Sequence, residues 1–109
     1  MKAEALRLMG LARRAGAVAT GSEATRRAIR SGEARLVLTA DDASRLQLEK
    51  IERELRNQAV PRVILGDRAT LGAAVGRGPT TAVAVTGASF AAELCKRLGT
   101  GDLPHELEE

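Results

Sequence analysis

The stretch GSEATRRAIRSGEARLVLTADDAS, residues 21–44, predicts a helix, a buried strand and the start of a second helix. Its apolar part, ARLVLTA at residues 34–40, is rich in leucine and β-branched residues over the length of a strand, and it is too short for an independent helix. Asp41, Asp42 and Ser44 follow directly and are typical of a helix start. This succession indicates an α/β protein.

The helix before this strand has two candidate N-caps. Thr20 and Glu23 have the spacing of a capping box, and Ser22 is a competing cap. We expect the helix to run from there to Ser31 and to end at Gly32, because glycine readily adopts the left-handed conformation that closes a helix.

The same alternation of helices and strands continues on both sides of this stretch. We predict a helix over residues 2–15, a strand over 18–20, a helix around Leu48, Ile51 and Leu55 whose charged residues such as Glu54 face water, a strand over 62–65, a helix from Asp67 to Val75, a strand over 82–85, and a helix around Phe90, Leu94 and Leu98. The order predicts an α/β fold with a sheet of about four strands and helices on both faces.

The chain of 109 residues is long enough for one hydrophobic core. We expect a single domain over residues 1–100, followed by an acidic, flexible tail at 101–109. No apolar run approaches the roughly 18 residues that a membrane span needs, and no signal-peptide pattern is present, so we expect a cytoplasmic protein without a membrane partner. Cys95 is the only cysteine, so we predict no internal disulfide, no structural metal and no cofactor.

Catalytic constellations are scarce in this sequence. The only histidine, His105, lies in the predicted tail, and Cys95 lies on the apolar side of the last helix, where a cysteine is typical of the core. Asp41 and Asp42 are suited to binding a metal ion with a phosphate, but acids at a helix entry are the commoner interpretation. The loop GRGPTT, residues 76–81, contains only part of a phosphate-binding pattern, because no Walker lysine follows it. We therefore predict a protein that is not an enzyme.

Positive charge dominates the chain outside its last residues. The sequence has 17 Lys and Arg residues, mostly Arg, and 14 acidic residues. Four of the acidic residues lie in residues 101–109, where no basic residue offsets them, so residues 1–100 are strongly basic. Such a domain indicates a polyanionic partner, nucleic acid first, although an arginine-rich composition is equally compatible with codon usage or solubility.

Arg26, Arg27 and Arg30 occupy the short helix predicted from residue 22. Their guanidinium groups and the N–H groups at the start of the helix are suited to converge on a phosphate or a base edge. The alternative is a solvated helix face, for which balancing glutamates are expected and are largely missing from the helix. Phe90 is the only aromatic residue, so RNA recognition by stacking on aromatic side chains is excluded.

The stretch at residues 21–44, together with VPRVILGDRATLGAAVG at residues 60–76, resembles the ribosomal protein L7Ae/L30e family of kink-turn RNA-binding proteins. The resemblance is to its small bacterial YlxQ-like branch and covers residues 5–98. It implies a three-layer α-β-α sandwich around a mixed four-stranded sheet. It also implies that RNA is held by the start of the second helix and by the loop before the last strand.

By position, the resemblance and the arginine pattern together predict eleven RNA-binding residues at these two places and at one basic position between them. They are Gly21, Ser22, Glu23, Arg26, Arg27, Arg30, Arg68, Arg77, Gly78, Pro79 and Thr80. We expect Arg27 to contact a guanine or a phosphate, and Arg26 and Arg30 to supply charge toward the backbone.

The start of the second helix departs from the family pattern, which is an asparagine followed by a glutamate, with a lysine three residues later. An ungapped alignment places Glu23, Ala24 and Arg27 at these positions, so that only the cation is preserved. A shift by one residue places Ser22 and Glu23 at the first two positions instead, at the cost of an insertion later in the helix.

The function implied by this resemblance is non-enzymatic RNA binding, with a ribosome or another structured RNA as the partner. The alternative is a protein-interaction module of the same fold that docks on ribosomal or transcription-associated proteins. These alternatives differ in a measurable property, because phosphate contacts by arginine make RNA binding sensitive to salt.

Overall fold

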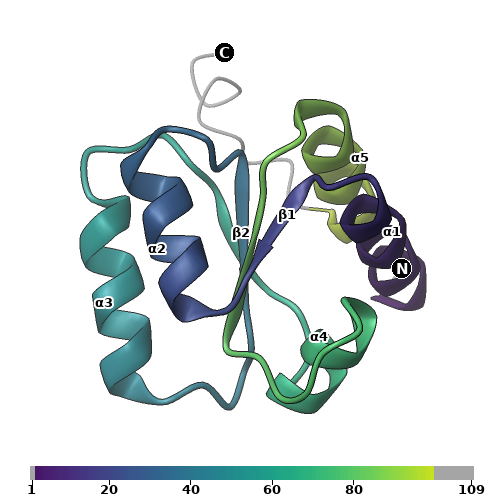
Figure 1. Cartoon of the computed structure of the whole chain (residues 1–109), viewed down its shortest axis with the longest axis horizontal. Helices are drawn as coiled ribbons and strands as arrows, with labels where there is room; N and C mark the ends of the chain where they lie inside the picture. Colours follow the sequence, from purple (N-terminus) through teal and green to yellow (C-terminus); the bar gives the residue numbers. More distant parts are fainter. Residues whose placement is uncertain (1, 100–109) are drawn as a thin grey trace.

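The computed structural model describes residues 2–99, in which five helices alternate with four strands (Figure 1). The helices are α1 (Lys2–Arg14), α2 (Ser22–Arg30), α3 (Arg45–Leu55), α4 (Arg68–Ala74) and α5 (Ala88–Leu98). The strands are β1 (Val18–Thr20), β2 (Leu36–Thr39), β3 (Arg62–Ile64) and β4 (Ala82–Val85). The predicted order is confirmed, whereas the tail predicted at 101–109, with His105, lies outside the described residues. Across 2–99, each helix is too short or too polar to traverse a bilayer.

The two central strands, β2 and β4, organise the sheet, whose strand order is β1-β4-β2-β3. β2 pairs in parallel with β3 and antiparallel with β4, and β4 pairs antiparallel with β1. Every residue of β2 and β4 is buried, as expected for apolar strands covered on both faces. The mixed four-stranded sheet predicted for this chain is therefore confirmed.

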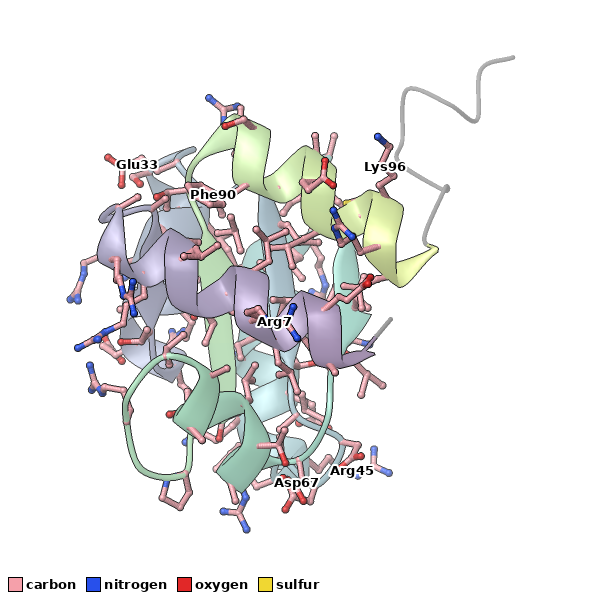
Figure 2. All side chains as sticks on the ribbon, turned by 90° about the vertical axis from the view of Figure 1, so that its right-hand side faces the viewer. Arg7, Glu33, Arg45, Asp67, Phe90 and Lys96 are labelled. Carbon is pink, nitrogen blue, oxygen red and sulfur yellow. The ribbon has the colours of Figure 1, made fainter. Side chains whose placement is uncertain are left out.

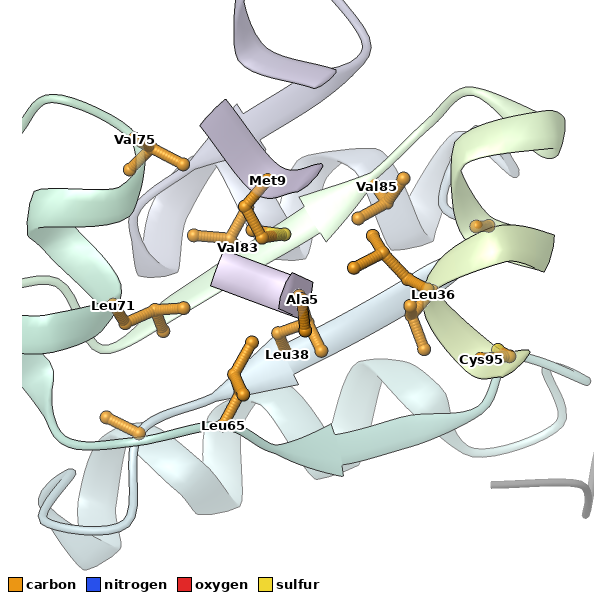
Figure 3. Packing of buried hydrophobic residues seen from close by; sticks show 13 residues of the cluster. Ala5, Met9, Leu36, Leu38, Leu65, Leu71, Val75, Val83, Val85 and Cys95 are labelled. Atoms are coloured by element: carbon orange, nitrogen blue, oxygen red, sulfur yellow. The ribbon is translucent and has the colours of Figure 1, made fainter. Parts of the chain in front are cut away.

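Helices cover both faces of the sheet and enclose two cores. α2 and α3 lie over one face, and α1, α4 and α5 lie over the other (Figure 1). Successive residues of β2 point to opposite faces, so that Leu36 and Leu38 enter the core beneath α1, α4 and α5 (Figure 3), while Val37 enters the core beneath α2 and α3. The three-layer α-β-α sandwich is therefore confirmed.

The start of α2 differs from the prediction. Its N-cap is Gly21, which has a φ of 100° that suits glycine, and no side chain caps the helix. The predicted capping box of Thr20 with Glu23 and the alternative cap Ser22 are therefore wrong. Thr20 ends β1, and its hydroxyl accepts a hydrogen bond from Arg77 instead. The first N–H groups of α2 are thus left without a side-chain acceptor.

The helix starts predicted at Ser44 and Asp67 are confirmed, because both side chains cap their helices by accepting hydrogen bonds from the N–H groups of Gln47 in α3 and Thr70 in α4. Asp41 lies in the turn after β2 and does not belong to α3. Asp42 accepts a hydrogen bond from the backbone N–H of Arg68 at 2.8 Å, so it serves the start of α4. The parallel pairing of β2 with β3 explains this contact, because it brings the ends of both strands to the same edge.

Candidate nucleic-acid interface

The start of α2 and the loop at residues 76–81 lie side by side at one end of the sheet (Figure 1). The N–H of Gly21 donates to the carbonyl oxygen of Ala82 at 2.8 Å. Nη1 of Arg77 donates to Oγ1 of Thr20 at 2.8 Å, across 57 positions of sequence. Both bonds form because β1 ends where its antiparallel partner β4 begins. The two segments that the resemblance assigns to RNA thus share one surface.

Loop 76–81 is held against α4 at a position where a side chain would not fit. The N–H of Arg77 donates to the carbonyl oxygen of Gly72, which lies within α4, at 2.8 Å. A Cβ atom on Gly72 would lie only 1.9 Å from the carbonyl oxygen of Gly78. The glycine therefore lets the loop pack directly on the helix.

Thr80 shapes the loop from within. It is only 6% exposed, and its hydroxyl donates to the carbonyl oxygen of Gly78 at 2.8 Å. Of the loop residues predicted to contact RNA, Arg77, Gly78 and Pro79 are exposed. These three residues are therefore placed for contact, whereas Thr80 fixes the path of the chain behind them.

Arg27 differs from its neighbouring arginines on α2. It is exposed, and within residues 2–99 no carboxylate lies close enough to form an ion pair with it. Arg26 and Arg30 instead turn toward α3, where both bind Oε2 of Glu54. Of the three arginines on this helix, Arg27 is the one whose charge stays available.

The contact with Glu54 corrects two expectations from the sequence. The side chain of Glu54 is only 17% exposed, so it does not simply face water. It also supplies the balancing carboxylate that seemed to be missing for Arg26 and Arg30, because α3 packs beside α2. The solvated-face interpretation is thus wrong for Arg26 and Arg30, which make contacts between helices.

The residues at the uncapped start of α2 are small or exposed. Ser22 and Ala24 are partly buried, and the side chain of Glu23 is 72% exposed, with its Oε1 atom 3.7 Å from Arg26. No side chain caps this end, and the N–H groups of a first helical turn carry the positive end of the helix dipole. A ligand with oxygen acceptors can therefore approach the main chain beside Gly21.

Arg68 joins the same surface from α4. The N–H of Thr80 donates to the carbonyl oxygen of Arg68 at 3.0 Å, which places this residue against the loop. The side chain of Arg68 is half exposed, and its Nε atom lies 3.5 Å from Oδ1 of Asp42. Pairs of this exposure contribute little to stability, so the guanidinium group can exchange Asp42 for a phosphate at small cost.

Reasoning from the sequence missed three residues that build this surface, which are Thr20, Glu54 and Gly72. Gly72 had a signal, since a glycine inside a helix is unfavourable and indicates a packing reason. Thr20 and Glu54 had none, because each acts through a contact with a residue far away in the sequence.

Cys95 and Asp42, two of the residues considered for catalysis or metal binding, have structural roles in the described part of the chain. Cys95 is 5% exposed and belongs to the core, as predicted. Asp42 is engaged with the start of α4. Within residues 2–99, no group of three or more His, Cys, Asp or Glu side chains is arranged to hold a metal ion.

An α-β-α sandwich whose second helix begins beside the loop before the last strand is the architecture expected from the resemblance. Residues 3–95 match the Ribosomal protein L7Ae/L30e/S12e/Gadd45 family. The chain belongs to this family, and the match covers nearly all of the described residues.

Relatives of known sequence or structure agree with this assignment. The chain is 36% identical to the RNA-binding protein YlxQ of Bacillus subtilis (strain 168) over 91 residues, which are 84% of this chain and 91% of YlxQ. A protein of unknown function from Bacillus halodurans C has a similar structure, with a TM-score of 0.81 and 29% identity, covering 87% of this chain and 96% of the other. The Giardia lamblia 15.5kD RNA binding protein has the same fold, with a TM-score of 0.71 and 22% identity, covering 87% of this chain and 84% of the other.

Proposed function

We propose that this chain is a non-enzymatic, cytoplasmic RNA-binding protein that recognises structured RNA, in the ribosome or in another ribonucleoprotein. The RNA-binding surface consists of the start of α2, loop 76–81 and Arg68. The membership of the family and the relative named as an RNA-binding protein support this function.

The observation that carries the proposal is that cations without a carboxylate partner occur on the same two segments as an uncapped helix start. Arg27 and Arg77 are both exposed and without a carboxylate partner in the described part of the chain. The hydrogen bond between Gly21 and Ala82 holds the start of α2, which no side chain caps, next to the end of loop 76–81. Fixed amides and guanidinium groups are the donors that hold phosphates and guanine edges.

The mode of recognition follows from what the surface contains. Phe90, the only aromatic residue, is packed against the core beneath α1 and α5, so bases cannot stack on it. Contacts must therefore come from arginine, from main-chain amides and from the shape of the RNA. We propose that a bent or kinked RNA fits this surface better than a straight duplex. A bend brings two separate segments of the same RNA strand to α2 and to the loop at once.

An electrophoretic titration with two RNAs tests the proposal. A kink-turn RNA and a straight duplex of equal length are each titrated with the full chain at low and at moderate salt. We expect saturable binding of both, with tighter binding of the kink-turn RNA and weakening of both as salt rises.

Two other outcomes have clear meanings. Equal affinity for the two RNAs would remove the preference for a kinked shape and leave a general RNA-binding protein. Failure of either RNA to saturate the protein would contradict RNA binding itself and favour the protein-interaction module.

A further inference from the structure

A groove with a volume of about 240 Å³ lies between α1 and the end of α4, outside the surface described above. Its lining residues are Arg7, Gly10, Leu11, Arg13, Arg14 and Ala74. Figure 2 looks onto α1 and shows Arg7 on the solvent side of this helix. Half of the lining residues are arginines, so the groove carries positive charge.

The groove follows one face of α1. Arg7, Gly10, Leu11 and Arg14 have the spacing of residues that lie above one another on a helix. Gly10 lets α1 approach α4 closely, because a Cβ atom there would lie 3.3 Å from the carbonyl oxygen of Ala74. Arg7 and Arg14 stand about 10 Å apart along the axis at about 1.5 Å per residue. A duplex strand carries one phosphate per roughly 3.4 Å of axis, so the two guanidinium groups can reach separate phosphates of one strand.

Among residues 2–99, the arginines of this groove have no carboxylate partner. Glu4, one turn before Arg7, binds Arg97 of α5 at 3.1 Å. In the part of the chain from residue 2 to residue 99, no carboxylate forms an ion pair with Arg7, Arg13 or Arg14. Arg13 and Arg14 lie in the last turn of α1 and offset its dipole. Arg7 lies in the middle of the helix, so the dipole does not account for it.

The groove is continuous with the proposed RNA-binding surface. The guanidinium group of Arg13 lies over Gly76, where a Cβ atom would come within 3.1 Å of Nη1. Gly76 begins loop 76–81, and the next residue, Arg77, reaches Thr20 at the end of β1. Positive charge therefore extends from α1 across the loop to the start of α2.

From this geometry we infer that the groove binds the phosphate backbone of a second RNA segment, the stem that flanks the segment held at α2. The inference rests on the proposed function and extends its surface to a helix that the family resemblance does not assign to RNA. The exposed side chain of Leu11 lies between the arginines, where it can pack on a ribose while they hold the adjacent phosphates.

The test compares two kink-turn RNAs that share the same kink and differ in one stem, which is short in one RNA and longer by a helical turn in the other. The full chain is compared with the double variant Arg7→Gln/Arg14→Gln. We expect the variant to lose the extra affinity of the wild type for the long-stem RNA, and its log–log salt slope with that RNA to become shallower by about 2. Its affinity for the short-stem RNA should be unchanged.

The matched control is Arg53→Gln/Arg56→Gln, which removes two exposed arginines near the end of α3, on the other side of the sheet. This control should bind both RNAs as the wild type does, and thermal melting verifies that both double variants fold. If the two double variants bind the long-stem RNA equally well, the groove inference is overturned while RNA binding stands. If the wild type saturates with neither RNA, the proposed function fails and the groove inference fails with it.

Discussion

At the scale of the residue, the arginines of α2 have different roles because their neighbours differ. Arg26 and Arg30 share a carboxylate from α3 and thereby join two helices. Arg27, one position further around the helix than Arg26, has no such partner in the described residues and keeps its donors free. A planar fork of donors in this position suits a guanine edge or a phosphate.

Replacing Arg27 by alanine tests this division of roles. We expect RNA binding to weaken by about 1 to 3 kcal/mol, roughly 5- to 150-fold, if the guanidinium group makes a bidentate base contact. Fluorescence anisotropy with a labelled kink-turn RNA measures the change. Arg35→Ala is the control, because Arg35 is exposed and lies before β2, at the opposite end of the sheet. Equal affinities of the two variants would exclude Arg27 from the site.

At the scale of the element, the short helix α4 and the loop after it behave as one unit. The carbonyl oxygen of Gly72 accepts a hydrogen bond from the loop, and the absent side chain gives the loop its space. The hydroxyl of Thr80 closes the loop on itself. The exposed residues Arg77 and Pro79 are thus presented on a supported segment, which reduces the entropy that binding must otherwise remove.

The substitution Gly72→Ala should disrupt this unit. The added Cβ atom would lie 1.9 Å from a backbone oxygen, so the loop must move, and we expect a loss of about 1 to 3 kcal/mol in the free energy of unfolding. RNA affinity should fall in the same variant, even though Gly72 itself is buried. Urea denaturation and RNA titration measure the two effects.

Ala73→Gly serves as the control within the same helix. It removes a side chain from an exposed position and should cost roughly 1 kcal/mol through helix propensity alone, without displacing the loop. If both variants lose stability but neither loses RNA affinity, the loop does not contribute to binding.

Helices and strands were predictable from the sequence wherever the pattern of apolar residues determined which structure forms. The LVLT and AVAV runs gave the central strands, and the spacing of Leu48, Ile51 and Leu55 gave α3. Hydrogen-bond partners were less predictable. Asp42 accepts from the start of α4 and Thr20 accepts from Arg77, and both contacts depend on which strands become neighbours. The proposed surface therefore follows from the resemblance and stays a prediction, whereas the availability of each cation on it could not be predicted from the sequence.

At the scale of the whole molecule, three helices, α2, α3 and α4, begin at the same end of the sheet. β1, β2 and β3 run in the same direction, because β4 is antiparallel to both β1 and β2 while β2 and β3 are parallel. The helices that follow them, α2, α3 and α4, consequently begin at the same end (Figure 1). The positive ends of their dipoles add to the field of the arginines there.

This distribution predicts the salt dependence of binding. If Arg27, Arg68 and Arg77 each neutralise one phosphate, the logarithm of the association constant should fall against the logarithm of salt with a slope of about −2 to −3. Titrations of a short-stem RNA over a range of potassium chloride concentrations measure the slope. A slope near zero would mean that phosphates are not the groups recognised at this end.

The ladder between β1 and β4 has a consequence for the spacing of this surface. Only three residue pairs join the two strands, from Val18 opposite Val85 to Thr20 opposite Val83. A slip of one pair would displace the first turn of α2 relative to the loop by about 3.4 Å and turn each side chain of β1 to the other face. Insertions at the tip of the loop leave that separation unchanged. RNA preference can therefore change more readily through substitutions or insertions in the loop than through changes in β1. The short strand β1 sets the distance between the loop and α2.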